Sequence, residues 1–129
     1  MGTIETKLDQ SQDLTIAKAR GKMTADDFRK WRLSYYSGTV TRDILWDLIE
    51  ADFSGIASND IQEHAKRIKE NVSDVREGGK TAIYVDENYL ALGLCRMREI
   101  YGEMEDTPIE IRTFTDMDEA MEWLGIKDS

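Results

Sequence analysis

The sequence has few of the residues that most often carry metal or redox chemistry. It contains one cysteine, Cys95, and one histidine, His64, so it can form neither an internal disulfide nor a cluster of histidine ligands. No apolar run approaches the roughly 20 residues that a membrane-spanning helix needs. The first residues also lack the basic and apolar regions of a signal peptide. These absences predict a cytoplasmic protein with no membrane span, no metal site and no cofactor.

Positive charge is also in short supply. The chain carries 17 Lys and Arg residues against 26 Asp and Glu residues, which gives a net charge of −9 at pH 7. Because an acidic surface repels phosphate backbones, nucleic acid is not an expected partner. The 129 residues are 40% hydrophobic, which is typical of one globular domain, and no linker or internal repeat divides them. We therefore expect a single domain over residues 1–129.

The segment Thr41–Gly55 contains a nearly continuous apolar run. Residues 44–49 are apolar except for Asp47, which is typical of a central strand that is buried on both faces. A carboxylate in such a strand needs hydrogen bonds or a charged partner, because burying an unpaired charge is costly. We expect Asp47 to accept hydrogen bonds from amides of the loop that follows, with direct contact to a ligand as the alternative.

The rest of the chain alternates between strand and helix patterns. Alternating apolar residues predict an N-terminal hairpin, and two further strand patterns follow the central strand. Apolar residues at steps of three and four, with capping residues before them, predict four helices. The expected strands are Thr3–Leu8, Leu14–Ala19, 44–49, Thr81–Val85 and 108–113. The helices follow caps at Thr24, Ser58, Asp86 or Asn88, and Asp116, and they end near Gly38, Gly78-Gly79, Gly102 and Gly125. The apolar stripe of the second helix reaches Val75. The order ββαβαβαβα predicts an α/β fold with a mixed, mostly parallel sheet.

Three short segments carry a family resemblance: the strand end Trp46–Leu48, the turn Leu92–Met97 of the third predicted helix, and the ending Phe114–Leu124. Together with the element order, they resemble the STAS-like superfamily, which is the fold of bacterial anti-sigma-factor antagonists. Within it they resemble the small, mostly uncharacterised SpoIIAA-like branch. The likeness extends over essentially the whole chain. It implies helices mainly on one side of the sheet, and it implies no catalysis.

One feature of the regulatory members of that family is missing here. They carry Asp-Leu at the end of this strand and then Asp-Ser-Ser-Gly or Asp-Ser-Thr-Gly, in which a partner kinase phosphorylates the first serine or the threonine. In this sequence Asp47-Leu48 matches, but the later positions read Gly55-Ile56-Ala57-Ser58. Since no hydroxyl stands at the matching position, we expect no serine kinase to modify the loop of residues 55–58.

Polar side chains gather where two central strands are expected to end. Asp47, Ser54 and Ser58 belong to one strand end, and Asp86 and Asn88 belong to the other. Open parallel sheets leave a crevice at this edge, and two helix N-termini direct free amides towards it. These five residues are therefore the predicted site for a ligand or partner. Helix capping alone also selects Asp, Asn and Ser at such positions, and that explanation stays open.

No nucleophile with a neighbouring base is apparent in the sequence, so we expect no enzymatic activity. His64 and Cys95 are expected to be structural residues of their helices. The favoured function is a non-enzymatic, STAS-like binding or regulatory domain that acts through contact with a protein partner, with a homodimer as one arrangement. The alternative is a carrier of a small apolar ligand or lipid, whose helices open over an apolar cavity.

Overall fold

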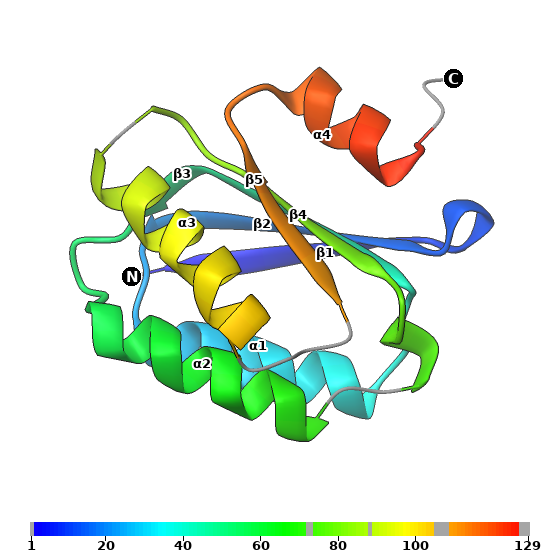
Figure 1. Ribbon diagram of the computed structural model, residues 1–129, viewed down its shortest axis with the longest axis horizontal. Helices are drawn as coiled ribbons and strands as arrows, with labels where there is room; N and C mark the ends of the chain where they lie inside the picture. Colours follow the sequence, from blue (N-terminus) through cyan, green and yellow to red (C-terminus); the bar gives the residue numbers. More distant parts are fainter. Residues whose placement is uncertain (1, 72–73, 88, 105–108, 127–129) are drawn as a thin grey trace.

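The computed structural model describes residues 2–71, 74–87, 89–104 and 109–126. Five strands form one sheet in the order in which they follow each other along the chain (Figure 1). They are β1 (Thr3–Asp9), β2 (Leu14–Lys22), β3 (Asp43–Asp52), β4 (Lys80–Tyr84) and β5 (Glu110–Phe114). β1 and β2 pair antiparallel, and all later pairs are parallel. The predicted hairpin and the mixed, mostly parallel sheet are confirmed.

Four helices join or follow the strands. They are α1 (Ala25–Ser37), α2 (Ser58–Asn71), α3 (Tyr89–Met104) and α4 (Met117–Leu124), and two short 3-10 helices are η1 (Gln10–Gln12) and η2 (Asp74–Arg76). α1, α2 and α3 each connect two neighbouring parallel strands and pack on one face of the sheet, whereas α4 packs on the other (Figure 1). Because neighbouring strands follow each other in sequence, every right-handed crossover passes over the same face. The expectation of helices mainly on one side is confirmed.

The alternation of side chains along β3 divides the interior into two cores. Leu48 points towards α1–α3, and Leu45 points towards α4. The core under α1–α3 is the larger one. Its buried members are Ala19, Met23, Leu48, Phe53, Ile56, Ile83, Val85, Leu94 and Cys95, and those of the α4 core are Leu14, Leu45, Ala82, Ala120 and Leu124.

Local hydrogen bonds place the ends of α1 and α4 where the sequence predicts them. At the start of α1 the Thr24 hydroxyl accepts from the Asp27 amide at 3.2 Å, and the Asp27 carboxylate accepts from the Thr24 amide at 2.9 Å. At the start of α4 the Asp116 carboxylate accepts from the amides two and three residues on. α4 ends at Gly125, whose φ of 75° is a conformation that glycine adopts at little cost.

Two predictions for α2 are wrong. α2 begins at Ser58 itself, so Ala57 holds the cap position and Ser58 is not the N-cap. The Asp60 carboxylate accepts from the Ala57 amide at 2.9 Å, and this bond closes the first turn without a serine hydroxyl. Val75 was expected on the apolar stripe of α2, but it lies beyond that helix in η2 and is 49% exposed. It faces outward because this turn brings the next residue, Arg76, into the interior.

The start of α3 also differs in part from the prediction. α3 begins at Tyr89, so Asp86 is too far from the helix to be its cap. The predicted cap at Asn88 and the predicted strand start at Pro108 lie outside the described residues. Val85 follows β4 as a fully buried residue, as its place in the predicted strand implies.

Candidate functional site

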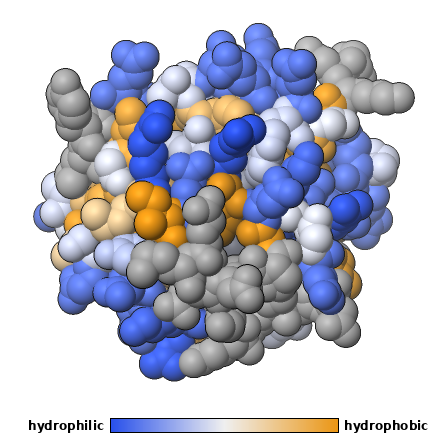
Figure 2. Space-filling view, viewed as in Figure 1, coloured by the Kyte–Doolittle hydropathy of each residue, from blue (hydrophilic) through white to orange (hydrophobic). Residues whose placement is uncertain are grey.

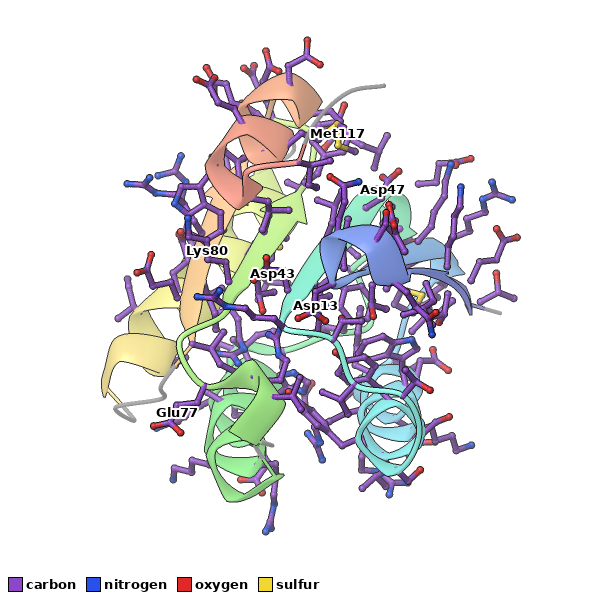
Figure 3. All side chains as sticks on the ribbon, turned by 90° about the vertical axis from the view of Figure 1, so that its right-hand side faces the viewer. Asp13, Asp43, Asp47, Glu77, Lys80 and Met117 are labelled. Carbon is purple, nitrogen blue, oxygen red and sulfur yellow. The ribbon has the colours of Figure 1, made fainter. Side chains whose placement is uncertain are left out.

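The structure distributes the predicted site residues over two faces of the sheet. Asp47 is half-buried on the face that carries α4 (Figure 3). Ser58 begins α2 on the opposite face and is exposed, and Ser54 is exposed in the loop before it. Asp86 is exposed after β4, and Asn88 lies outside the described residues. The four described residues therefore do not meet in one crevice, and their role as a site stays a prediction.

Asp47 makes a local hydrogen bond instead of the expected contacts with the next loop. Its carboxylate accepts from the Ile49 amide at 3.3 Å, two residues on in the same strand. α4 has eight residues and covers only part of its face, so this end of β3 stays open to water and Ile49 is 36% exposed. A carboxylate in contact with water needs no buried partner, which explains why the strand tolerates Asp47 here.

A cavity lies on the other face, between the sheet and helices α1–α3. Its volume is about 130 Å³, and residues of all three helices, of β3, β4 and β5, and of η2 line it. Protein interiors are closely packed and contain few voids larger than a water molecule. This space is much larger than one water molecule needs, so it has room for several water molecules or for a small organic molecule.

The end of the cavity near the carboxyl ends of the strands is aromatic. Phe28 of α1 packs against Trp46 of β3 with ring centroids 5.5 Å apart, and it stacks on Phe53 of the following loop at 6.2 Å. Trp31 meets Trp46 edge-on at 4.6 Å, and Ile61 lines this region from α2. These ring faces and edges form a wall that suits a planar or apolar group.

Towards the amino ends of β3 and β4, the cavity holds three buried arginines. Arg32 of α1, Arg76 of η2 and Arg98 of α3 line the cavity, with exposed fractions of 5%, 1% and 9%. Among the described residues, none of the three forms an ion pair with a carboxylate. Nε of Arg32, Nε of Arg76 and Nη1 of Arg98 are buried there without a hydrogen-bond partner. Since buried charges are normally paired, this end of the cavity has unused capacity for an anion.

Hydrogen bonds hold two of these arginines in place. Arg76 donates from Nη1 to the carbonyl oxygen of Arg42 at 2.7 Å and from Nη2 to the hydroxyl of Thr81. Nη1 of Arg32 lies 3.2 Å from Nδ1 of His64. Since a guanidinium group only donates, Nδ1 of His64 accepts this bond, and the imidazole is the neutral tautomer with its proton on Nε2.

Burial keeps the imidazole and the thiol of the cavity neutral. Burial, together with the nearby guanidinium groups, lowers the pKa of His64 to about 3. Burial also raises the pKa of the Cys95 thiol to about 12, and the carboxylate of Glu99 acts in the same direction. At neutral pH the cavity therefore contains a protonated thiol and an uncharged imidazole.

Arg98 keeps its charge in spite of its burial. Burial lowers the pKa of Arg98 to about 10, which still leaves the guanidinium protonated at neutral pH. Burial raises the pKa of Tyr36, while Arg76 and Arg98 act in the opposite direction, so cations lie close to this hydroxyl. The cavity thus presents guanidinium cations and a phenol at one end and aromatic rings at the other. This arrangement can hold an anion that has an apolar body.

The basic run with Arg29 and Lys30 predicts Arg32 on a solvated helix face. This prediction is wrong, because Arg32 is buried, and no prediction covers Arg76 or Arg98. Arg32 and Arg98 come four residues after Phe28 and Leu94, on the faces of α1 and α3 that line the cavity. A charged residue at a core position of a helical stripe is the signal that identifies such a side chain. Arg76 offers no periodic signal, because it stands in a short turn.

Comparison with known proteins establishes the fold. No family model and no curated protein matches the sequence. Among solved structures, the chain is similar to an uncharacterised protein of the DUF3478 family from Shewanella loihica PV-4, which has a SpoIIAA-like fold. The two share 21% sequence identity over 95% of this chain and 93% of that chain, with a TM-score of 0.58. This chain therefore has a SpoIIAA-like fold, as the resemblance in its sequence predicts.

The described residues lack two further kinds of feature. No helix there is long and apolar enough to cross a membrane. The same residues contain no group of three or more His, Cys, Asp or Glu side chains placed to hold a metal ion. The residues that line the cavity all belong to the described part of the chain.

Proposed function

We propose that this chain is a non-enzymatic binding domain that takes a small, largely apolar molecule into the cavity under α1–α3. The observation that carries this proposal is the cavity itself, a space of about 130 Å³ with aromatic walls, which is far larger than the voids usual in a closely packed protein interior. An apolar cavity of about 150 Å³ is large enough to accept benzene. The apolar part of the ligand inside the cavity is therefore expected to be about the size of one aromatic ring.

The expected path into the cavity runs between α1 and α2. These two helices meet only along a short stretch, whereas α2 and α3 contact each other more extensively. Phe28 and Ile61, which line the cavity from α1 and α2, are half-buried. Separating α1 from α2 disrupts little packing, so a local opening there costs less than one elsewhere around the cavity.

The described lining of the cavity offers no activated nucleophile, and this supports binding over catalysis. The Cys95 thiol, with a pKa of about 12, is protonated at neutral pH, whereas the thiolate is the nucleophilic form. His64 already accepts a hydrogen bond from Arg32, and its pKa of about 3 makes it a weak proton acceptor. The lack of enzymatic activity is part of this proposal.

The regulatory role through a protein partner, with a homodimer as one arrangement, stays a prediction of the sequence. Apolar side chains do reach the surface among hydrophilic ones in Figure 2, and Ile100 of α3 is 57% exposed. Exposed apolar side chains are normal on monomeric proteins, so Ile100 by itself identifies no partner.

The test of the proposed function places a bulky side chain in the cavity. Ile61→Trp enlarges a residue of the lining, and the matched control Ile16→Trp makes the same exchange at a half-buried position beside the α4 core. Toluene, benzamide and benzoate serve as ring-sized probes, and ligand-observed NMR measures their binding to the full chain. We expect the wild type and Ile16→Trp to bind at least one probe equally well, and Ile61→Trp to bind it about tenfold more weakly or worse.

Two results contradict the proposed function. One is that none of the three probes binds to the wild type. The other is that Ile61→Trp folds, as circular dichroism shows, and still binds the probe with the affinity of the wild type.

A further inference from the structure

We infer that the ligand of this cavity is a carboxylate with an aromatic or short aliphatic body, and that Arg32, Arg76 and Arg98 hold its carboxylate group. This inference rests on the proposed function and names the chemical class of the ligand. It follows from four observations: the uncompensated buried charge, the pairing of the surface arginines, the number of unused donors, and the apolar opposite end of the cavity.

The buried charge of the three arginines has no counterion among the described residues. Each of the three residues is exposed for less than a tenth of its surface, and each has a buried nitrogen without a hydrogen-bond partner in the described part of the chain. Taking a cation out of water costs several kcal/mol unless a counterion compensates. The hydrogen bonds of Arg76 to the Arg42 carbonyl and the Thr81 hydroxyl offset part of this cost. Both acceptors are neutral, so they do not compensate its charge. A bound anion would supply the missing counterion.

Three arginines at the surface of the same chain do have carboxylate partners. Arg67 lies 3.0 Å from Glu63, Arg20 lies 3.3 Å from Glu50, and Arg29 pairs with Asp26. The sequence has 26 Asp and Glu residues, so carboxylates are abundant. Three cations without a carboxylate partner in the described interior therefore leave a place that a bound anion can fill.

The number of unused donors matches a carboxylate. Nε of Arg32, Nε of Arg76 and Nη1 of Arg98 provide three buried N–H donors, and the Tyr36 hydroxyl lies in the field of two of these guanidinium groups. An ionised carboxylate accepts up to about four hydrogen bonds through its two oxygens. A phosphate group has three strongly accepting oxygens and would leave part of its capacity unmet at this site. The net charge of −9 also opposes the approach of a multiply charged anion.

The other end of the cavity specifies the body of the ligand. Phe28, Trp31 and Trp46 line it, with their rings at edge-to-face distances of 4.6 to 5.5 Å. Such walls favour an apolar, planar group over a polar one. With the guanidinium groups at one end and the rings at the other, a ligand with one charged end binds in one orientation.

The test compares three ligands that share one ring and differ in the attached group: benzoate, benzamide and phenyl phosphate. Isothermal titration calorimetry on the full chain measures each dissociation constant, and the fluorescence of Trp31 and Trp46 in the cavity wall serves as a second readout. We expect benzoate to bind at least about tenfold more tightly than benzamide, because the amide leaves the buried charges uncompensated. Phenyl phosphate is expected to bind more weakly than benzoate.

Two variants connect this preference to the arginines. Arg98→Met removes a buried guanidinium and is expected to abolish the preference for benzoate over benzamide, measured as the ratio of the two dissociation constants. The matched control Arg67→Met removes a surface arginine of α2 and is expected to change neither affinity. Arg32→Gln, which keeps a donor near His64, repeats the comparison if Arg98→Met does not fold.

Each result decides between the inference and the proposed function. If benzamide binds to the wild type as tightly as benzoate, or if Arg98→Met keeps the preference, the inference is overturned while the proposed function stands. Tighter binding of phenyl phosphate overturns the choice of a carboxylate. If none of the ring compounds binds, the proposed function itself fails.

Discussion

The charged side chains on the two faces of the sheet differ in their exposure to water and in their pairing. On the face that carries α4, Lys18 and Arg20 of β2 lie 3.0 Å and 3.3 Å from the carboxylate of Glu50, and all three side chains are exposed to water for a third or more of their surface. On the face under α1–α3, Arg32 and Arg98 are buried and form no ion pair within the described chain. Exposed ion pairs change stability little, whereas buried, unpaired cations reduce it. Under the proposed function, the cavity face gives up stability for binding, whereas the ion pairs of the α4 face leave stability almost unchanged.

The largest expected effect tests the packed core of the α4 face. Leu124→Ala removes a buried side chain of α4 and should lower the free energy of unfolding by about 2–5 kcal/mol, as truncations in packed cores do. Leu33→Ala is the control, because Leu33 of α1 is 48% exposed, and it should cost less than about 1 kcal/mol. Urea unfolding measures both values. A loss below about 0.5 kcal/mol for Leu124→Ala would mean that α4 is not part of a packed core.

The second effect has the opposite sign and belongs to the cavity face. Arg98→Met replaces a buried cation by an apolar side chain of similar length, so it should raise the free energy of unfolding without ligand by about 1–4 kcal/mol. Arg20→Met on the open face should change it by less than about 1 kcal/mol. Urea unfolding in ligand-free buffer measures both values. Destabilisation by Arg98→Met would show that this guanidinium already has a stabilising partner.

A third effect makes the cavity face sensitive to pH. Unfolded His64 takes up a proton below pH of about 6.5, whereas folded His64, with a pKa of about 3, stays neutral to a much lower pH. The unfolded state therefore binds more protons as the pH falls, and the free energy of unfolding should fall by about 1–2 kcal/mol from pH 7 to pH 5. Carboxylates with lowered pKa values, such as Asp26, titrate mainly below this range. His64→Gln should remove most of this loss in urea unfolding, and an equal loss in the variant would exclude His64 as its source.

The smallest effect compares the first turns of two helices on opposite faces. Ser58→Ala at the start of α2 should cost less than about 0.5 kcal/mol, because the Asp60 carboxylate already bonds the Ala57 amide. Asp116→Ala at the start of α4 should cost about 1 kcal/mol, because its carboxylate accepts two amide hydrogen bonds. Thermal unfolding of both variants measures the difference. Equal losses of stability in the two variants would show that Ser58 does act as a helix cap.

The sequence by itself determined the order of strands and helices and most of their ends. The capping pair Thr24 and Asp27, the cap Asp116 and the terminal Gly125 act on amides within a few residues, so local chemistry is enough to place them. Ser58 shows the limit of this reasoning, because serine and aspartate two residues apart compete for the same amides and the sequence does not say which prevails. The alternation of strands with helices was also enough to determine the parallel sheet and its SpoIIAA-like fold.

Only the tertiary structure decided where the charges lie and where the core is hollow. Asp47 stands in an apolar strand and was expected to be buried, yet the short α4 leaves its end of β3 open to water. Arg32 and Arg98 stand in helices that read as ordinary amphipathic segments, yet both point into the space between those helices and the sheet. The physical reason is that burial depends on which distant elements cover a side chain. Periodicity and capping within one segment carry no information about these distant elements. The packing of α1–α3 on the sheet formed the cavity and brought arginines from three elements into it.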